Sequence, residues 1–318
     1  MRDILCFGTI VLDYVLLVER FPNVNENTFV KRMRITKGGT GANCAVVGSS
    51  LGKLCGIVSV VGKDFQSTGY EHYLIEKKID LTTVFKDESM LLPRCFLFSK
   101  GDDQMIFYYE EFEKTDALLN NNIDKVLEQI EHYKVLHFST GHFDFYHRLL
   151  SENRPEKIIS FDPGQETFTR TNEVLNIIPY TDILFVNEYE MRKIVEVSGL
   201  ETIRDLKGPR IIIVSYGEKG SIIHYKEHEI HIPIAKPEKI VDPTGCGDAH
   251  RVSFLSKLLE FVSSREELDN ISRKELEIAG KFASVVASFI IEAEGAQTNA
   301  PTLEKVKERY RKNFGSEP

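Results

Sequence analysis

Short, continuous runs of Val, Ile and Leu recur along this 318-residue chain, and helix-like segments separate them. Runs of this length are typical of strands buried on both faces of a parallel sheet, and their spacing predicts βαβ units. We therefore expect a doubly wound α/β fold. The expected strands are 4–10, 56–62, 134–139, 157–162, 182–187 and 211–215, and the expected helices are 41–51, 65–78, 252–259, 274–292 and 301–313.

Two regions break this alternation. Residues 14–35 and 93–110 are rich in β-branched and aromatic side chains and lack a helical period. Such segments favour antiparallel strands or hairpins. The two regions can join into a small accessory sheet that covers the active site as a lid, or they can form edge strands of the main sheet.

Composition excludes several classes of protein. The formal net charge is −8 and the sequence has no basic patch, which disfavours nucleic-acid binding. No apolar run approaches the roughly 20 residues that span a bilayer, so no membrane association is expected. Five widely spaced cysteines without a C-x-x-C pair indicate reduced thiols and a cytoplasmic protein.

The segment 241–251 carries the strongest chemical signal. Gly245 and Gly247 flank Cys246, Asp248 follows at once, and a helical segment comes next. A glycine turn that opens a helix gathers unpaired N–H groups and positive dipole potential, and therefore predicts an anion site. An acid beside such a site fits a base that accepts a proton from a nucleophile attacking the anion. The pattern indicates phosphoryl transfer to a hydroxyl, with Asp248 as the general base.

A second glycine cluster, 37–43, contains Gly38, Gly39, Gly41 and Asn43. Glycines let a backbone approach a ligand closely, and Asn43 can hydrogen-bond hydroxyls, so the cluster predicts a substrate-binding turn, with a plain tight turn as the alternative. It matches the dinucleotide fingerprint poorly because Cys44 stands at the third glycine position. The sequence contains no Walker A loop, so ATP would need a different phosphate cradle.

Together the two clusters resemble the two signatures of the PfkB (ribokinase-like) carbohydrate and nucleoside kinases. Lesser matches follow in the expected order at Gly8 and Asp13, Val61-Gly62-x-Asp64, Asn187-x-x-Glu190, Gly217-x-x-Gly220 and Gly295-Ala296. The resemblance covers nearly the whole chain. It implies a single three-layer α/β/α domain over residues 1–318, with the lid formed by about 14–35 and 93–110.

The resemblance also implies site roles. Asp248 is similar to the catalytic base, and Gly245, Cys246 and Gly247 resemble the anion hole. Asn187 and Glu190 resemble the pair that organises Mg²⁺ through water, although Glu190 also fits a first-turn helix acid. The acceptor side comprises Asp13, Gly38, Gly39 and Asn43. The ATP side comprises Asn187, Ser215, Gly217, Gly220, Thr244 and Gly295.

The acceptor is the open part of this interpretation. Pro243, Cys246 and the segment 102–106 resemble prokaryotic adenosine or nucleoside kinases, so a nucleoside is favoured over a free sugar. A sugar kinase and a non-catalytic sensor of nucleotide or sugar are the alternatives.

Arg251 can contact a phosphate or pair with an acid, and the resemblance makes a homodimer through the lid plausible. An aromatic wall for a base is available in Phe96, Phe98, Phe107, Tyr108 and Tyr109.

Overall fold

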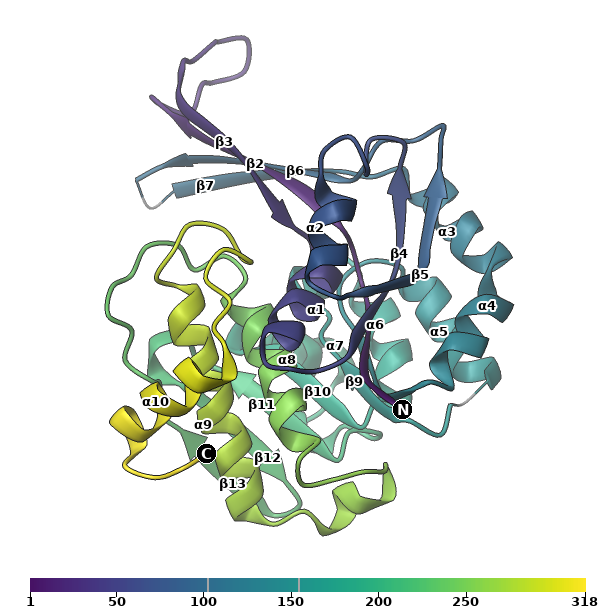
Figure 1. Ribbon diagram of the computed structural model, residues 1–318, viewed down its shortest axis with the longest axis vertical. Helices are drawn as coiled ribbons and strands as arrows, with labels where there is room; N and C mark the ends of the chain where they lie inside the picture. The colour runs from purple at the N-terminus through teal and green to yellow at the C-terminus, as the bar shows by residue number, and fades with distance from the viewer. Residues whose placement is uncertain (102, 154) are drawn as a thin grey trace.

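The computed structural model describes residues 1–101, 103–153 and 155–318. Its main feature is a nine-stranded sheet in which neighbouring strands run parallel, except that β12 pairs antiparallel with both β11 and β13 (Figure 1). This confirms the predicted mainly parallel α/β architecture. In spatial order the strands are β13 (His228–Ile232), β12 (Ser221–Tyr225), β11 (Ile211–Ser215), β10 (Ile183–Asn187), β9 (Ile158–Phe161), β8 (Tyr133–Phe138), β1 (Arg2–Phe7), β4 (Cys55–Gly62) and β5 (Asp80–Asp87).

Helices cover both faces of this sheet because successive residues of each buried strand point to opposite sides. In β1, Ile4 and Cys6 pack into one core, and Leu5 and Phe7 pack into the other. The first core is closed by α1 (Thr40–Ser50), α2 (Tyr70–Glu76), α8 (Cys246–Leu258), α9 (Arg273–Ile290) and α10 (Leu303–Phe314). The second is closed by α3 (Phe112–Asn121), α4 (Ile123–Ile130), α5 (Phe143–Asn153), α6 (Thr171–Ile177) and α7 (Glu188–Ser198).

The two regions without helical period form one separate sheet. Its order is β3 (Val30–Gly38), β2 (Val11–Val18), β6 (Arg94–Lys100) and β7 (Asp103–Tyr109). The central pair β2 and β6 is parallel, and both outer pairs are antiparallel. The alternative of edge strands on the main sheet is wrong, because β5 and β13 occupy those edges. Asp102 falls in the second region and lies outside the described residues.

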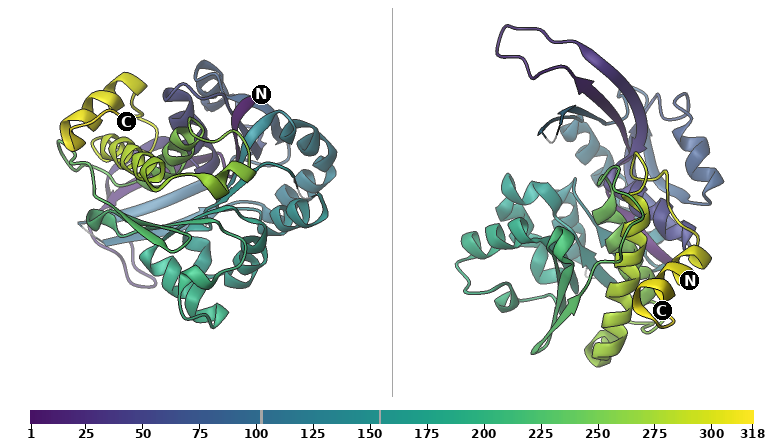
Figure 2. Two further views of the ribbon diagram at one scale, coloured as in Figure 1. Left: turned by 90° about the horizontal axis from the view of Figure 1, so that it is seen from below. Right: turned by 90° about the vertical axis from the view of Figure 1, so that its left-hand side faces the viewer.

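The small sheet projects beyond the layered body (Figure 2). Its root is held by Asp64, whose carboxylate accepts hydrogen bonds from the Leu92 N–H at 2.7 Å and from Arg94 at 2.6 Å. Arg94 is the first residue of β6, so this ion pair fixes the point where the strand leaves the body. Asp64 of the Val61-Gly62-x-Asp64 match therefore anchors the small sheet to the body of the protein.

Several predicted boundaries are wrong, and the helix expected from Val252 begins six residues earlier, at Cys246. The helix expected from Phe65 begins at Tyr70, because residues 65–69 form a turn that ends in Gly69 with φ of 69°. The first strand ends at Phe7 rather than Ile10, and the Thr9 carbonyl accepts a hydrogen bond from Ala42 in α1 at 3.2 Å. Within the described residues, no helix combines the length and apolar character needed to cross a membrane.

Candidate active site

The N-terminus of α8 forms a turn suited to an anion. Gly245 is its N-cap in the left-handed region, with φ of 78°, and a side chain there would collide with Ala296. Only glycine meets both conditions without strain. The Cys246 N–H donates to the Pro243 carbonyl at 3.1 Å, and helical geometry leaves the N–H groups of Gly247 and Asp248 without intrahelical acceptors. Residues 245–248 are called the anion turn below.

Asp248 lies in the first turn of α8 and is 8% exposed. Its Oδ2 accepts a hydrogen bond from Asn43 Nδ2 at 2.8 Å, and its Oδ1 lies 3.4 Å from a guanidinium nitrogen of Arg251. Burial raises the pKa of the Asp248 carboxyl, whereas Arg251 and the Asn43 hydrogen bond oppose that rise. The carboxyl is thus desolvated, and two fixed donors set its orientation.

Arg251 pairs with acids, which is one of the two interpretations given for this residue. Its Nε lies 2.8 Å from Oδ2 of Asp162, which immediately follows β9. Burial raises the pKa of Asp162, Arg251 opposes this rise, and the charges of Glu190 and Asp248 add to it. Arg251 is therefore the cation at the centre of three buried carboxyl groups, those of Asp162, Glu190 and Asp248.

The first glycine cluster links the small sheet to the first helix. Gly38 ends β3, Gly39 is the N-cap of α1 with φ of 96°, and Asn43 lies within α1. The Asp13 carboxylate of β2 lies so close to Gly38 that a side chain there would collide with it. Burial, followed by the charges of Asp248 and Asp242, raises the pKa of Asp13 to about 7. The structure thus brings Asp13 and Gly38 into contact and places Asp13 within electrostatic range of the anion turn.

The side chain of Asn43 makes hydrogen bonds to other residues of the protein at both its nitrogen and its oxygen. Its Nδ2 donates to Asp248, and its Oδ1 accepts from Gln297 Nε2 at 2.8 Å. Gln297 also donates to the Tyr70 hydroxyl at 2.8 Å, and that hydroxyl donates to the Gly38 carbonyl at 2.6 Å. Sequence reasoning missed Gln297 and Tyr70. The signal for Gln297 was its place directly after Gly295-Ala296.

Asp242 gathers part of the predicted ATP side. Its Oδ1 accepts from the Thr244 N–H and its Oδ2 from the Gly295 N–H, both at 2.9 Å. Arg34 of β3 also donates to Oδ2, at 3.0 Å. Burial would raise the pKa of Asp242, but the hydrogen bonds from Thr244 and Gly295 and the charge of Arg34 hold it below its usual value. An ionised Asp242 thus ties two loops and the small sheet together.

Asn187 and Glu190 form a capping box at the start of α7. The Asn187 side chain accepts from the N–H groups of Tyr189 and Glu190, both at 2.9 Å. Glu190 returns the contact by accepting from the Asn187 N–H at 2.8 Å and from its Nδ2 at 2.7 Å. Burial raises the pKa of Glu190. Glu190 is therefore a first-turn helix acid, as the alternative interpretation has it. Its carboxylate also lies within electrostatic range of Arg251.

The remaining ATP-side residues follow β11. Ser215 is its last residue and lies beside Asn187 in the sheet register. Gly217 and Gly220 bound the turn into β12, which is closed by a 2.8 Å hydrogen bond from the Tyr216 N–H to the Gly220 carbonyl. Asn187 and Ser215 thus form one group at the carboxyl edge of the sheet, where ligands bind in open α/β folds. Thr244 and Gly295 form a second group around Asp242.

The donor set at this edge suits a hard cation. Asp162, Asn187 and Glu190 supply only oxygen ligands, and each carboxylate oxygen keeps a lone pair beyond its protein contact. Among the described residues, no group of three or more His, Cys, Asp or Glu side chains is placed to hold a metal directly. Mg²⁺ retains several waters in most sites, so contact through water fits these residues.

The aromatic residues of the small sheet divide into two sets. Phe96 stacks on Tyr14 with ring centroids 5.1 Å apart, and Phe98 meets Phe107 edge to face at 5.8 Å. Phe107, Tyr108 and Tyr109 are exposed. Phe96 packs against Tyr14 as aromatic residues in strands usually do, and the partly exposed rings of β7 are the ones that a ligand could reach.

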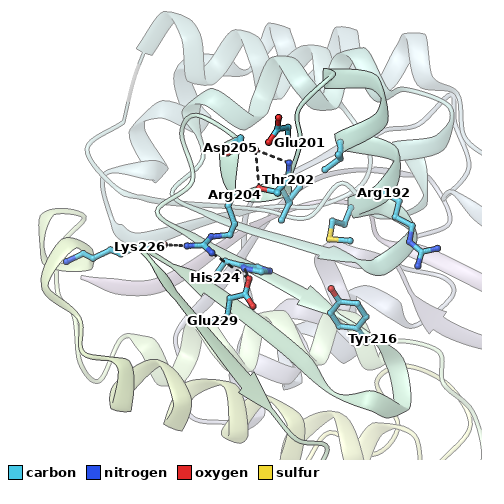
Figure 3. Close-up of a pocket in the computed structure, with 12 residues that line it drawn as sticks. Arg192, Glu201, Thr202, Arg204, Asp205, Tyr216, His224, Lys226 and Glu229 are labelled. Atoms are coloured by element: carbon cyan, nitrogen blue, oxygen red, sulfur yellow. Dashed lines mark hydrogen bonds and ion pairs between the residues drawn. The ribbon is translucent and has the colours of Figure 1, made fainter.

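A separate cavity of about 650 Å³ lies between α7, the 201–205 segment and the β12–β13 hairpin (Figure 3). Arg204 lies 3.7 Å from Glu229 and donates to the Lys226 carbonyl at 3.0 Å, and His224 lies 3.5 Å from Glu229. The lining contains none of the predicted site residues. The charges of Arg204 and Glu229 are engaged with each other, and this cavity is separate from the anion turn.

Comparison with known proteins agrees with the geometry. The model of the pfkB family carbohydrate kinases matches residues 1–303. A nucleoside kinase of Methanocaldococcus jannaschii is 33% identical over 98% of both chains. A nucleoside kinase of Methanothermobacter thermautotrophicus is 35% identical over 100% of this chain and 98% of its own.

Solved structures show the same fold. The M. jannaschii nucleoside kinase, described as an archaeal member of the ribokinase family, superposes with a TM-score of 0.82 at 32% identity, over 98% of this chain and 99% of its own. A Burkholderia thailandensis nucleoside kinase in complex with inosine gives 0.83 at 21% identity, over 99% and 100%. The second likeness supports the ribokinase-like fold alone.

Proposed function

The chain belongs to the pfkB family of carbohydrate kinases and is therefore a phosphotransferase with an alcohol group as acceptor, and we propose that its acceptor is a nucleoside. The observation that carries the chemistry is the buried Asp248 beside the open N–H groups of the anion turn. The two archaeal relatives above 30% identity are both named nucleoside kinases, which favours a nucleoside over a free sugar. Family membership leaves the non-catalytic sensor without support.

In the proposed mechanism, the acceptor hydroxyl lies over Asp248. The Asp248 carboxylate accepts the hydroxyl proton while the hydroxyl oxygen of the acceptor attacks the γ-phosphorus of ATP. The bond between this phosphorus and the β–γ bridging oxygen breaks, and ADP leaves. The N–H groups of Gly245 and Gly247 donate to the transferring phosphoryl group, on which charge is concentrated, whereas the Cys246 N–H is engaged with the Pro243 carbonyl. Cys246 would hold the shape of the turn through its backbone hydrogen bond to Pro243, and its thiol points away toward the Ala287 carbonyl at 3.8 Å.

ATP and Mg²⁺ are the proposed cofactors. Asn187 and Glu190 would hold the metal through water, and Mg²⁺ supplies charge neutralisation for the phosphates. Ser215, Gly217, Gly220, Thr244 and Gly295 are proposed to contact the nucleotide. The acceptor side keeps Asp13, Gly38 and Gly39 as proposed contacts, whereas Asn43 is proposed to act through Asp248.

The four-stranded sheet is proposed to act as a lid over the acceptor. Asp13 of β2 and Gly38 of β3 belong to both this sheet and the proposed acceptor site. Closure of a lid excludes water and limits wasteful hydrolysis of ATP.

A homodimer through the same sheet is also proposed, because the sheet exposes many apolar side chains, among them Met33, Ile35, Met105, Ile106 and Phe107. The five free cysteines support a reducing, cytoplasmic location.

The function is tested by measuring ADP release from ATP with a panel of nucleosides and free sugars. Turnover with nucleosides well above that with ribose and fructose supports the proposal. The opposite preference makes the protein a sugar kinase, and absence of turnover with every acceptor contradicts both. The same assay without Mg²⁺ is expected to show no activity.

Arg34 is expected to act as a latch between the lid and the nucleotide loops. It bridges Asp242 and Glu294 and is only 22% exposed. Arg34→Ala should raise the KM for both substrates about tenfold, which corresponds to about 1.4 kcal/mol, with little change in Tm. Arg32→Ala is the matched control, because Arg32 pairs with Glu294 at 3.2 Å but not with Asp242 and is 63% exposed. Equal effects of the two variants would contradict the latch.

A further inference from the structure

Gln297 stands at a crossing of three parts of the site. It is buried, and it follows the 295–296 loop that Asp242 fixes. Its Nε2 donates one hydrogen bond to Asn43 Oδ1 in α1 and another to the Tyr70 hydroxyl at the start of α2, both at 2.8 Å. Both N–H bonds are therefore used within the protein.

The direction of each hydrogen bond matters more than its presence. Asn43 has one donor end and one acceptor end, and the donor end faces the Asp248 carboxylate. If the Asn43 carboxamide turned over, its oxygen would face the carboxylate and its NH₂ group would face the NH₂ group of Gln297. Both contacts would then join groups of the same kind, so Gln297 excludes the reversed orientation.

The Tyr70 hydroxyl fixes Gln297 in turn. It donates to the Gly38 carbonyl at 2.6 Å, so it offers its oxygen as an acceptor to Gln297. Tyr70 and Gln297 are both fully packed, with Tyr70 showing no exposed surface. A single chain of directed hydrogen bonds thus runs from the Gly38 backbone to the Asp248 carboxylate.

We propose that Gln297 is a positioning residue that holds the Asn43 carboxamide with its donor toward Asp248 and links this orientation, through Tyr70, to the glycine turn at the acceptor side. This inference rests on the proposed function, because it assigns to Gln297 the preparation of the base. Gln297 has no contact with the reacting atoms in this scheme. It acts only through Asn43.

A measurable consequence is the proton affinity of Asp248. The hydrogen bond from Asn43 favours the ionised carboxylate and lowers its pKa, so losing that bond raises it. The other charged or titratable groups that face Asp248 stay in place when Gln297 is replaced: Arg251 and Cys246 on α8, Asp162 after β9, Asp13 on β2, Cys44 on α1 and Cys6 on β1.

The test compares the wild type with Gln297→Met, which keeps the length of the side chain and removes its donors. Because the base works only when ionised, the acid limb of the kcat/KM profile should move up by about one pH unit, which lowers kcat/KM about tenfold at any fixed pH on that limb. Gln129→Met, on α4 at the far side of the sheet, makes the same chemical change and should leave the limb in place. An acid limb that stays at its wild-type pH in folded Gln297→Met overturns the proposal.

A second measurement does not depend on turnover. NMR titration of ¹³C-labelled Asp side chains, assigned to Asp248 with Asp248→Asn, should show the same upward shift in Gln297→Met. An unchanged titration of Asp248 overturns the positioning role even if the variant is less active. Failure of the wild type to phosphorylate any acceptor would instead contradict the proposed function, so the two failures are distinguishable.

Discussion

Asp248→Asn is expected to lower kcat by about 10²- to 10⁴-fold with little change in KM, because the amide cannot accept the hydroxyl proton. The substitution keeps the shape of the side chain, and Asn43 can still donate to the remaining oxygen. It also removes a buried negative charge whose ionised form burial disfavours. Stability should therefore be retained, and Arg251 keeps its ion pair with Asp162 at 2.8 Å.

Steady-state ADP release at saturating ATP measures this loss, and thermal unfolding checks that the variant is folded. Asp144→Asn is a suitable control, because Asp144 lies in the first turn of α5 and is exposed. Its turnover should equal that of the wild type. Near-normal turnover of Asp248→Asn would contradict the assignment of the base.

Arg251→Leu is expected to destabilise the protein by about 3–5 kcal/mol, because it leaves buried carboxylates without their cation. The sign of the pH dependence follows from the directions of the pKa shifts. Burial raises the pKa of both Asp162 and Asp248 above the unfolded value, and losing Arg251 raises both further. The folded variant then binds protons more tightly than the unfolded chain, so its stability falls as the pH rises above the unfolded Asp value of about 3.9.

Urea unfolding at pH 5.5 and pH 8 measures this effect. The deficit of Arg251→Leu relative to the wild type should be larger at pH 8, and Arg251→Lys should recover part of it. Arg192→Leu removes a guanidinium that is 66% exposed and should change the stability by no more than about 0.5 kcal/mol. A deficit that is the same at both pH values would show that Arg251 acts through packing rather than charge.

The parts of the fold and site that could be predicted depend on neighbouring residues. Buried parallel strands appear as apolar runs, and the anion turn lies within four consecutive residues, 245–248, so local patterns reveal both. The joining of two distant segments into one small sheet also followed from their shared composition. The start of α2 was placed too early, because the apolar pattern does not show that residues 65–69 turn.

The unpredicted parts are contacts between distant residues. Gln297 and Asn43 are 254 positions apart, and Gln297 and Tyr70 are 227 apart. The residues next to Gln297 in the sequence do not indicate that it contacts Asn43 or Tyr70, and the residues next to those two do not indicate Gln297. Asp162 was visible as the polar end of a strand, but its partner Arg251 follows from the placement of α8 against that edge of the sheet. Asn43 was expected to meet the acceptor, and its pairing with Asp248 depends on the packing of α1 beside α8.

The small sheet is joined to the body by four chain connections, one for each of its strands, because β2–β3 and β6–β7 are separate excursions from the main fold. In the lid motion proposed above, Asp13 of β2 and Gly38 of β3 would move together with this sheet. An acceptor would thus bind tightly only to molecules in which the sheet is closed over the site. The apparent Kd of the acceptor then equals its intrinsic Kd divided by the fraction of molecules in this closed state. Measured affinities for different acceptors then share one common factor, set by this equilibrium, and their ratios alone report the contacts that distinguish one acceptor from another.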